Sequence, residues 1–259
     1  MRFSIHLAVS NHNGENRLPI DYQYIQSAVI YRILGAYDEE YATWLHNNGY
    51  QLESGKRFKL FCYSRFGFES YKTNPNDYTI SFGGNSVKWT ISFLPEKSTQ
   101  EFVMGLFNGT EFTIGNRSHR VSFQVTSLEN LPSPSFTETM EYTALSPVCI
   151  KQHINDHTLY LSPTDAHYSD GILKGLLSRY EAFHGKPFEG DISVFKFELL
   201  PGRVKSSLID IKGIKVRGYT YSFRLTAPKE LQQMAYEGGI GEECSQGFGY
   251  IDIIKSKIK

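Results

Sequence analysis

The sequence has no excess of charge of either sign. Lysine and arginine together number 27, aspartate and glutamate together also number 27, and the net charge is therefore zero. A protein that binds nucleic acid over its whole surface is usually strongly basic, and this composition does not indicate that class. Any site for a polyanion must be a local cluster of cations.

Cysteine is scarce, and the positions of the cysteines exclude a disulfide framework. The three cysteines are far apart and form no Cys-x-x-Cys pair: Cys62, Cys149 and Cys244. An odd number of scattered thiols fits a reducing compartment, so we expect a cytoplasmic protein. The sequence also has no compact group of His, Asp and Glu at metal-ligand spacing. His153 and His157 flank a probable turn and are interpreted as surface histidines, so we expect neither a metal nor another cofactor.

Long apolar runs are missing as well. No segment approaches the roughly 18 consecutive apolar residues that a membrane span needs. The first ten residues, MRFSIHLAVS, alternate in polarity and are too short for a signal peptide, so we expect no membrane association. The 259 residues are 40% hydrophobic, which is enough for one large domain or for two of about 100–150 residues.

Hydrophobic periodicity divides the first half of the chain into strands and helices. The elements expected there are a strand over 3–9, helices over 24–34 and 38–46, strands over 58–66, 78–82 and 87–94, a helix over 95–107 and a strand over 118–128. The turn Gly83-Gly84-Asn85 predicts that strands 78–82 and 87–94 form a hairpin.

A stretch rich in proline and serine, LENLPSPSFTET, follows and is the expected linker. The second half then repeats the order of the first, with a strand over 139–149, a helix over 166–183, strands over 192–199, 203–211 and 216–226, a helix over 228–236 and a strand over 250–254. Strand, helix, strand, strand, helix, strand is the split βαβ or ferredoxin-like order. We therefore predict the α+β class, with two tandem ferredoxin-like (RRM-like) domains over 1–130 and 137–259. A single larger α+β domain is the alternative.

The last helix is followed by a run of glycines, GGIGEECSQGFGYIDI, in which five glycines fall within twelve residues. A dinucleotide-binding glycine loop follows a strand and opens a helix, whereas here the order is helix, glycines, strand, so that class is excluded. Two interpretations remain. The run is either a helix cap and turn into a strand, or a loop whose backbone N–H groups face phosphates.

A basic stretch precedes this run. Only Asp210 opposes its six cations, which are Arg203, Lys205, Lys212, Lys215, Arg217 and Arg224. Tyr219, Tyr221 and Phe223 lie among them. Basic side chains interleaved with aromatic ones suit an RNA groove, where charge holds the backbone and rings stack on bases. The alternative is an ordinary sheet with a charged, solvated face.

Four segments together resemble one protein family. The glycine run matches the pattern G-x-G-x(5)-G-F-G with Gly239, Gly241, Gly247, Phe248 and Gly249. LPIDYQYIQSAVIYRIL, ATWLHNNGY and FKLFCYSRF follow one another in the family's order, and TALSPVCI resembles its mid-chain segment. The chain is thus similar over nearly its whole length to the CRISPR-associated repeat-processing endoribonucleases, the sixth Cas family of the RAMP superfamily.

The resemblance implies a fold, a reaction and three catalytic residues. It implies two ferredoxin-like domains that cut CRISPR repeat RNA (pre-crRNA) into guide units without a metal. In this reaction the 2′-OH attacks the adjacent phosphate and leaves 2′,3′-cyclic phosphate and 5′-OH ends. The family's tyrosine, histidine and lysine match Tyr31, His46 and Lys59, and Lys56 replaces Lys59 if the register shifts. The resemblance also makes the glycine run part of the RNA-binding surface.

These residue types suit the reaction. A histidine titrates near neutral pH and can take the proton of the 2′-OH or protonate the leaving 5′-oxygen, and the sequence leaves both roles open. A lysine neutralises the charge that accumulates on the phosphorane, and a tyrosine donates a hydrogen bond or positions the 2′-OH. Without the resemblance, Tyr31 reads as a core residue, His46 as a cation at a helix end and Lys59 as a solvated strand end.

Other functions stay open at this point. The first is a catalytically silent RNA-binding subunit of a CRISPR effector complex. This function and that of a nuclease differ in whether His46 is needed for a cut. The second is a small-molecule-binding ferredoxin-like protein, which would lack the salt-dependent RNA affinity that phosphate contacts produce. We expect repeat RNA as the partner, with or without an effector complex, and a monomer or a homodimer.

Overall fold

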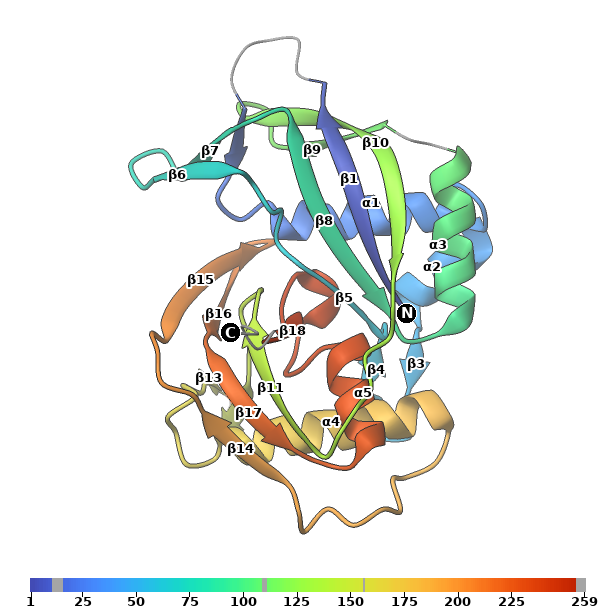
Figure 1. Cartoon of the computed structure of the whole chain (residues 1–259), viewed down its shortest axis with the longest axis vertical. Helices are drawn as coiled ribbons and strands as arrows, with labels where there is room; N and C mark the ends of the chain where they lie inside the picture. Colours follow the sequence, from blue (N-terminus) through green and yellow to red (C-terminus); the bar gives the residue numbers. More distant parts are fainter. Residues whose placement is uncertain (11–15, 109–110, 156, 255–259) are drawn as a thin grey trace, which may run out of the picture.

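Two β-sheets with their helices lie one above the other along the long axis of the molecule (Figure 1). The computed structural model describes residues 1–10, 16–108, 111–155 and 157–254. The first sheet is built from strands of residues 2–131 and the second from strands of residues 139–253. The predicted α+β class is confirmed. The division into domains at residues 130 and 137 stays a prediction.

The first sheet has the strand order β5-β8-β1-β10-β9, and its strands pair antiparallel. The elements are β5 (Phe61–Tyr63), β8 (Ser86–Phe93), β1 (Arg2–Val9), β10 (Arg120–Leu131), β9 (Glu111–Gly115), α1 (Gln23–Gly35), α2 (Glu39–Asn47) and α3 (Glu96–Asn108). Without β9, this is the ferredoxin-like order, with the first strand between the third and the fourth.

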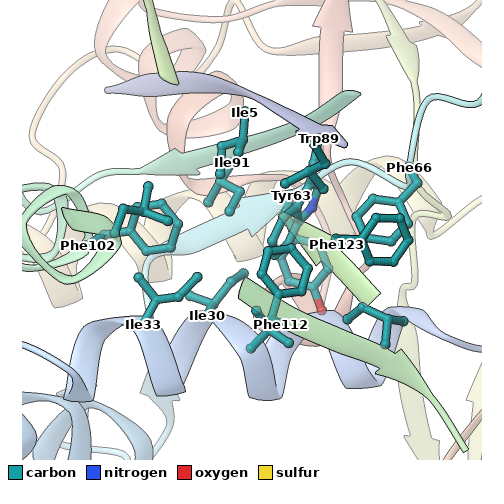
Figure 2. Close-up of a cluster of buried hydrophobic side chains, with 14 of the residues drawn as sticks. Ile5, Ile30, Ile33, Tyr63, Phe66, Trp89, Ile91, Phe102, Phe112 and Phe123 are labelled. Atoms are coloured by element: carbon teal, nitrogen blue, oxygen red, sulfur yellow. The ribbon is translucent and has the colours of Figure 1, made fainter. Parts of the chain in front are cut away.

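The core of the first domain lies between this sheet and its helices. Figure 2 shows Ile30 and Ile33 of α1 and Phe102 of α3 directed toward Ile5 of β1 and Ile91 of β8. Apolar residues recur on α1 every three or four positions, so one stripe of the helix is removed from water. This packing fixes the rotation of α1 about its axis, and with it the direction of the remaining side chains.

The second sheet has the order β14-β17-β11-β18, which is the same ferredoxin-like order. Its elements are β14 (Lys196–Leu199), β17 (Ser222–Thr226), β11 (Thr139–Ala144), β18 (Ile251–Ile253), α4 (Tyr168–His184) and α5 (Lys229–Gly238). Apolar residues of both helices and of the sheet form a second core. The prediction of two ferredoxin-like sheets in tandem is therefore confirmed.

Shorter strand pairs extend from these sheets. They are β12 (Lys151–Ile154) with β13 (His157–Tyr160), β15 (Lys205–Ile211) with β16 (Ile214–Thr220), β3 (Tyr50–Gln51) with β4 (Arg57–Phe58), and β2 (Arg17–Pro19) with β7 (Thr79–Gly83) and β6 (Ser70–Asn74). A 3-10 turn, η1 (Cys244–Gln246), lies inside the glycine run. His153 and His157 lie at the end of the β12–β13 hairpin and are exposed, as expected.

The predicted hairpin of strands 78–82 and 87–94 is wrong. β7 pairs with β2 and β6, whereas β8 pairs with β1 and β5. Both edges of β8 are occupied, so the Gly83-Gly84-Asn85 turn carries the chain from one sheet into another. The expected strand 216–226 is also two strands, because β16 pairs with β15 and β17 pairs with β11 and β14.

A buried arginine joins the two domains. Arg2 of β1 is 3% exposed and donates to the carbonyls of Tyr236 and Ile251, the latter at 2.7 Å. It also pairs with Asp252 at 3.2 Å, and its guanidinium lies 3.3 Å from the centre of the Tyr236 ring. Buried hydrogen bonds to a charged group are among the stronger polar contacts in proteins, so this cluster holds the domains in one relative position.

Candidate active site

Tyr31 and His46 come from two successive helices of the first domain. Tyr31 lies on α1 and packs against the first core, with its ring centre 5.7 Å from that of Phe61. His46 lies in the last turn of α2. Asp38 caps the start of this helix, where its carboxylate accepts from the backbone N–H of Tyr41 at 2.8 Å. The rings of Tyr31 and His46 meet edge to face with centres 5.0 Å apart.

Lys59 reaches the same place from a bend in the chain. The expected strand 58–66 is interrupted at Leu60, which has a φ of 55°. Phe58 and Leu60, on either side of the lysine, are buried in the second core. Lys59 is half-buried, and its Nζ donates to the backbone carbonyl of His46 at 2.7 Å. The bend therefore directs the lysine away from both cores and toward the histidine.

The environment decides which of these groups carries a proton. Burial raises the pKa of Tyr31, so its hydroxyl stays protonated and acts as a hydrogen-bond donor rather than as a base. Burial, and after it the charge of Arg57, lowers the pKa of Lys59 to about 8. Nδ1 of His46 lies 3.0 Å from Oδ1 of Asn47. An Nδ1–H bond to this oxygen leaves Nε2 as an acceptor, which is what a general base needs.

The three residues share one pocket of about 580 Å³. Helix α1, helix α2, the loop that holds Lys59, the β12–β13 hairpin, the β15–β16 hairpin and the glycine run all contribute to it. Its lining consists of Tyr24, Ser27, Ala28, Tyr31, His46, Lys59, Lys151, Tyr160, Ile211, Lys212, Ile214, Val216, Glu243, Ser245 and Gln246. Both domains therefore build the pocket.

Lys56, the alternative to Lys59, lies outside this lining. It is exposed, its Nζ lies 5.3 Å from the centre of the Phe58 ring, and it lines a second pocket of about 210 Å³. Lys59 lines both pockets. The geometry thus favours Lys59 as the lysine that meets a phosphate beside His46.

Five of the six cations named from the sequence gather on one hairpin, whereas Arg224 lies on β17 and pairs with Glu141 at 2.7 Å. Lys205, Lys212, Lys215 and Arg217 belong to β15–β16 or its turn, and Arg203 lies just before β15, separated from it by Val204. Lys212, with a φ of 52°, lies in the turn and lines the pocket, where its Nζ is 5.5 Å from the centre of the Tyr24 ring. Of these five cations, all except the half-buried Arg217 are exposed. The hairpin therefore presents a basic edge that leads to the pocket.

The aromatic residues expected among these cations do not all join them. Phe223 is 0% exposed and Tyr221 is 4% exposed, because both pack in the second core. The hydroxyls of Tyr221 and Tyr168 lie 2.7 Å apart in that core. The interpretation of Tyr221 and Phe223 as stacking platforms is wrong. Tyr24 and Tyr160 line the pocket that the basic hairpin helps to build.

The glycine run packs the two domains together. Its signature residues are all buried: Gly239, Gly241, Gly247, Phe248 and Gly249. The four glycines have φ values between 70° and 94°, a range that side chains other than glycine rarely adopt. A Cβ on Gly247 would lie 2.6 Å from Cβ of Gln23 on α1. Their role as RNA contacts stays a prediction, whereas the polar residues of the run, among them Glu243 and Gln246, reach the pocket.

Sequence reasoning missed several residues of the pocket. Lys151, Tyr160, Glu243 and Gln246 line it but were not named as site residues. Lys151 and Tyr160 face each other across the β12–β13 pair, a hairpin that the periodicity did not indicate. Glu243 and Gln246 stood inside the glycine run, where the glycines were the stronger signal.

In the described part of the chain, no group of three His, Cys, Asp or Glu residues is placed to hold a metal ion. None of the helices found there is long and apolar enough to cross a membrane.

The chain is similar to known proteins over its whole length. It is 26% identical over 99% of its length to a CRISPR-associated endoribonuclease Cas6 of Methanocaldococcus jannaschii, of which the match covers 94%. A solved structure of a Cas6-related protein from Pyrococcus furiosus superposes with a TM-score of 0.84 at 25% identity, covering 99% of each chain. An RAMP protein that binds different RNA substrates gives a TM-score of 0.82 at 22% identity, covering 98% of this chain and 100% of that one, and shows the fold.

Two family models cover almost the entire sequence. Residues 17–126 match the N-terminal model of the CRISPR-associated protein Cas6, and residues 131–253 match its C-terminal model. The order of the two matches follows the order of the two sheets, and the pocket that holds Tyr31, His46 and Lys59 lies where the matched regions meet. The chain belongs to the Cas6 family of CRISPR-associated proteins.

Proposed function

We propose that the chain is an endoribonuclease that cleaves CRISPR repeat RNA (pre-crRNA) into guide units. In the proposed reaction the 2′-OH next to the cut attacks the phosphorus, the bond to the 5′-oxygen breaks, and no metal takes part. The products carry a 2′,3′-cyclic phosphate and a 5′-OH. Family membership and the names of the endoribonuclease relatives support the reaction class.

One observation carries the proposal. Tyr31, His46 and Lys59 come from two helices and a bent loop, and they line one pocket that is wide enough for a nucleotide. Their rings and charges are held by local contacts: the edge-to-face contact of Tyr31 with His46 and the hydrogen bond from Lys59 to the carbonyl of His46. A fixed geometry of this kind is what positions reacting groups.

Each residue has a role that follows from its protonation. Lys59 carries its charge below about pH 8 and stabilises the negative charge that develops on the phosphorane. Tyr31 keeps its proton and donates to a phosphate oxygen or to the 2′-OH. His46 transfers a proton, either from the 2′-OH or to the leaving 5′-oxygen.

The RNA itself would approach along the β15–β16 hairpin. Lys205, Lys212, Lys215, Arg217 and the preceding Arg203 supply charge for several phosphates in a chain whose net charge is zero. Delivery of the product to an effector complex, a monomeric or homodimeric state and a cytoplasmic location stay predictions.

The test compares wild-type protein with His46→Ala on the repeat RNA from the same genome. His153→Ala is the matched control, because His153 is an exposed histidine on the β12–β13 hairpin and lies outside the pocket lining. We expect cleavage by wild type and by His153→Ala, and binding without cleavage by His46→Ala. Binding without cleavage by the wild type would overturn the proposal in favour of a silent RNA-binding subunit of an effector complex.

A further inference from the structure

The active-site pocket contains a polar cluster that the proposed reaction does not use. Glu243 accepts a hydrogen bond from Nζ of Lys151, and its second carboxylate oxygen accepts from Nε2 of Gln246 at 2.5 Å. All three residues line the pocket together with Tyr31, His46 and Lys59. Their side chains are partly exposed there, with 23% exposure for Glu243 and 16% for Lys151.

The fold holds this cluster in a defined position. The backbone N–H of Glu242 donates to the carbonyl of Cys149 at 2.7 Å, which places the glycine run beside the start of β12. Glu243 itself has a φ of 58° and a ψ of 27°, a left-handed conformation that residues other than glycine rarely adopt. Lys151 lies opposite Tyr160 in the β12–β13 pair, so the two side chains share one face of the hairpin.

The charges of the cluster do not suit a phosphate. A carboxylate repels phosphate oxygens, and the nearest cation, Lys151, is already paired with Glu243 and lies 3.8 Å from the carboxylate of Glu242. Burial lowers the pKa of Lys151, but the hydrogen bond and charge of Glu243 outweigh this and raise it. The lysine therefore stays charged and bound to its carboxylate, and the RNA backbone has better partners on the β15–β16 hairpin.

The cluster has hydrogen-bond donors and hydrogen-bond acceptors that its internal contacts do not use. A carboxylate has about four acceptor sites, and two of those on Glu243 are used by Lys151 and Gln246. Lys151 has three N–H groups, of which one serves Glu243. Two acceptor sites next to a donor therefore remain in the pocket.

The rest of the pocket lining is partly apolar. Tyr24 contributes a ring, and Ile211, Ile214 and Val216 of the β15–β16 hairpin contribute aliphatic surface. The volume of about 580 Å³ is within the range of about 300–1,000 Å³ that is typical of sites for small molecules. A nucleobase that enters the pocket therefore has a ring and aliphatic side chains to pack against, with the polar cluster in the same lining.

We propose that Lys151, Glu243 and Gln246 form a base-reading subsite for a guanine next to the scissile phosphate. Guanine presents two adjacent donors, N1–H and the 2-amino group, which a carboxylate accepts together, and beside them O6, which accepts from Lys151 or from the amide of Gln246. Adenine, cytosine and uracil each lack this pair of donors. The inference rests on the proposed RNA cleavage, because the nucleotide is positioned by its phosphate at His46 and Lys59.

The test measures affinity rather than cleavage. The RNA is the repeat with a 2′-deoxy nucleotide at the cut, which binds without being cut. The base on the 5′ side of the cut and the base on its 3′ side are each changed in turn to A, C, G and U. For wild-type protein we expect guanine at one of these positions to bind about tenfold more tightly than the other bases, as for a good paired contact to a base edge. Inosine at that position, which lacks the 2-amino group, removes most of the preference.

Two variants test whether the preference for guanine depends on Glu243. Glu243→Gln replaces one acceptor oxygen by an NH₂ donor and is expected to bind all four bases equally. Glu242→Gln is the matched control, because Glu242 is the neighbouring carboxylate and lines the second pocket but not the first, so the guanine preference is expected to persist. The inosine comparison uses wild-type protein alone and decides the question even if Glu243→Gln does not fold.

The results separate this inference from the proposed function. Equal affinity for all bases at every flanking position, a preference for a base other than guanine, or a guanine preference that persists in Glu243→Gln overturns the subsite. Cleavage is measured separately on all-ribose RNA. Failure to cut there overturns the proposed nuclease, while the affinities still decide whether guanine is read.

Discussion

Nζ of Lys59 donates a hydrogen bond to the backbone carbonyl of His46 at 2.7 Å, and the residues on either side of the lysine pack in a different core from the helix that carries the histidine. Lys59 lies between Phe58 and Leu60, which are buried in the second core, whereas α2 packs into the first core. The distance between Lys59 and His46, the lysine and histidine of the proposed active site, therefore depends on how the domains pack. Substitutions at the domain interface are therefore expected to change the rate of cleavage.

Gly49 is expected to position Lys59. Its φ is 62°, and a Cβ there would lie 2.5 Å from the carbonyl oxygen of Phe58 and 3.2 Å from Nζ of Lys59. Gly49→Ala should displace the lysine and reduce the single-turnover cleavage rate by about ten- to hundredfold, since small misplacements of reacting groups have effects of this size. RNA affinity should change much less than the rate.

Gly55→Ala is the matched control for this prediction. Gly55 also has a positive φ, 83°, but nothing lies within 4 Å of the added Cβ. Both substitutions should lower the free energy of unfolding by about 1–3 kcal/mol through backbone strain. Equal cleavage rates in the two variants would show that the contact of Gly49 with Lys59 is irrelevant.

The pKa of Lys59 predicts how cleavage depends on pH. Its value is lowered from 10.5 to about 8, so the charged form dominates below pH 8 and is lost above it. We expect kcat/KM to fall above about pH 8, because this parameter reports ionisations of the free protein. A rate that stays constant from pH 7 to above pH 9 would contradict the proposed role of the charge.

Lys59→Arg tests whether this decline belongs to Lys59. A guanidinium keeps its charge over the whole pH range of the measurement. The fall of kcat/KM above pH 8 should therefore disappear when the values for each protein are divided by that protein's own maximum. The absolute rate of the variant should still be lower, because a guanidinium differs from an ammonium in size and in donor geometry. A decline that persists in Lys59→Arg would assign the ionisation to another group.

Arg2 is expected to stabilise the domain interface. Arg2→Ala removes donors from the buried carbonyls of Tyr236 and Ile251 and leaves Asp252 without this partner. The free energy of unfolding should fall by about 3 kcal/mol, as for other buried hydrogen bonds to charged groups. Urea denaturation measures the change, and the exposed Arg120→Ala should stay within about 0.5 kcal/mol of wild type.

Lys212 at the turn of the β15–β16 hairpin is expected to bind an RNA phosphate. Lys212→Ala should weaken binding of all RNA sequences alike and reduce the slope of log Kd against log salt concentration by about 1. Lys97→Ala of α3 is the control, because Lys97 is exposed but pairs with Asp38 outside the pocket lining. An unchanged slope for Lys212→Ala would show that Lys212 does not bind an RNA phosphate.

Much of the fold could be predicted from the sequence because its pattern is local. The apolar stripe of α1, the acid cap Asp38 of α2 and the alternation of β1 each give a signal within ten residues. The pairing of strands is harder to predict, because it depends on residues that are far apart in the sequence. The turn at Gly83-Gly84-Asn85 indicated a change of direction, but only the distant β1 and β2 decide which strands pair.

The candidate site shows the same limit. Tyr31, His46 and Lys59 could be named because they stand in segments with a recognisable pattern. Glu243 and Lys151 meet only because the glycine run pairs with the start of β12, which no local pattern reports. The burial of Tyr221 and Phe223 was missed because the basic stretch changes sheet after Thr220, so that the preceding cations lie on β15–β16 and Phe223 lies on β17.

The most direct test of the account is the chemistry of the cut in EDTA. Wild-type protein is incubated with repeat RNA and, in parallel, with the same RNA carrying one 2′-deoxy nucleotide at the cleavage position, and the product ends are analysed. The account predicts cleavage of the first RNA to a 2′,3′-cyclic phosphate and a 5′-OH, and binding of the second without cleavage. Cleavage of the deoxy substrate, or products with a 5′-phosphate, would contradict attack by the 2′-OH and with it the roles of Tyr31, His46 and Lys59.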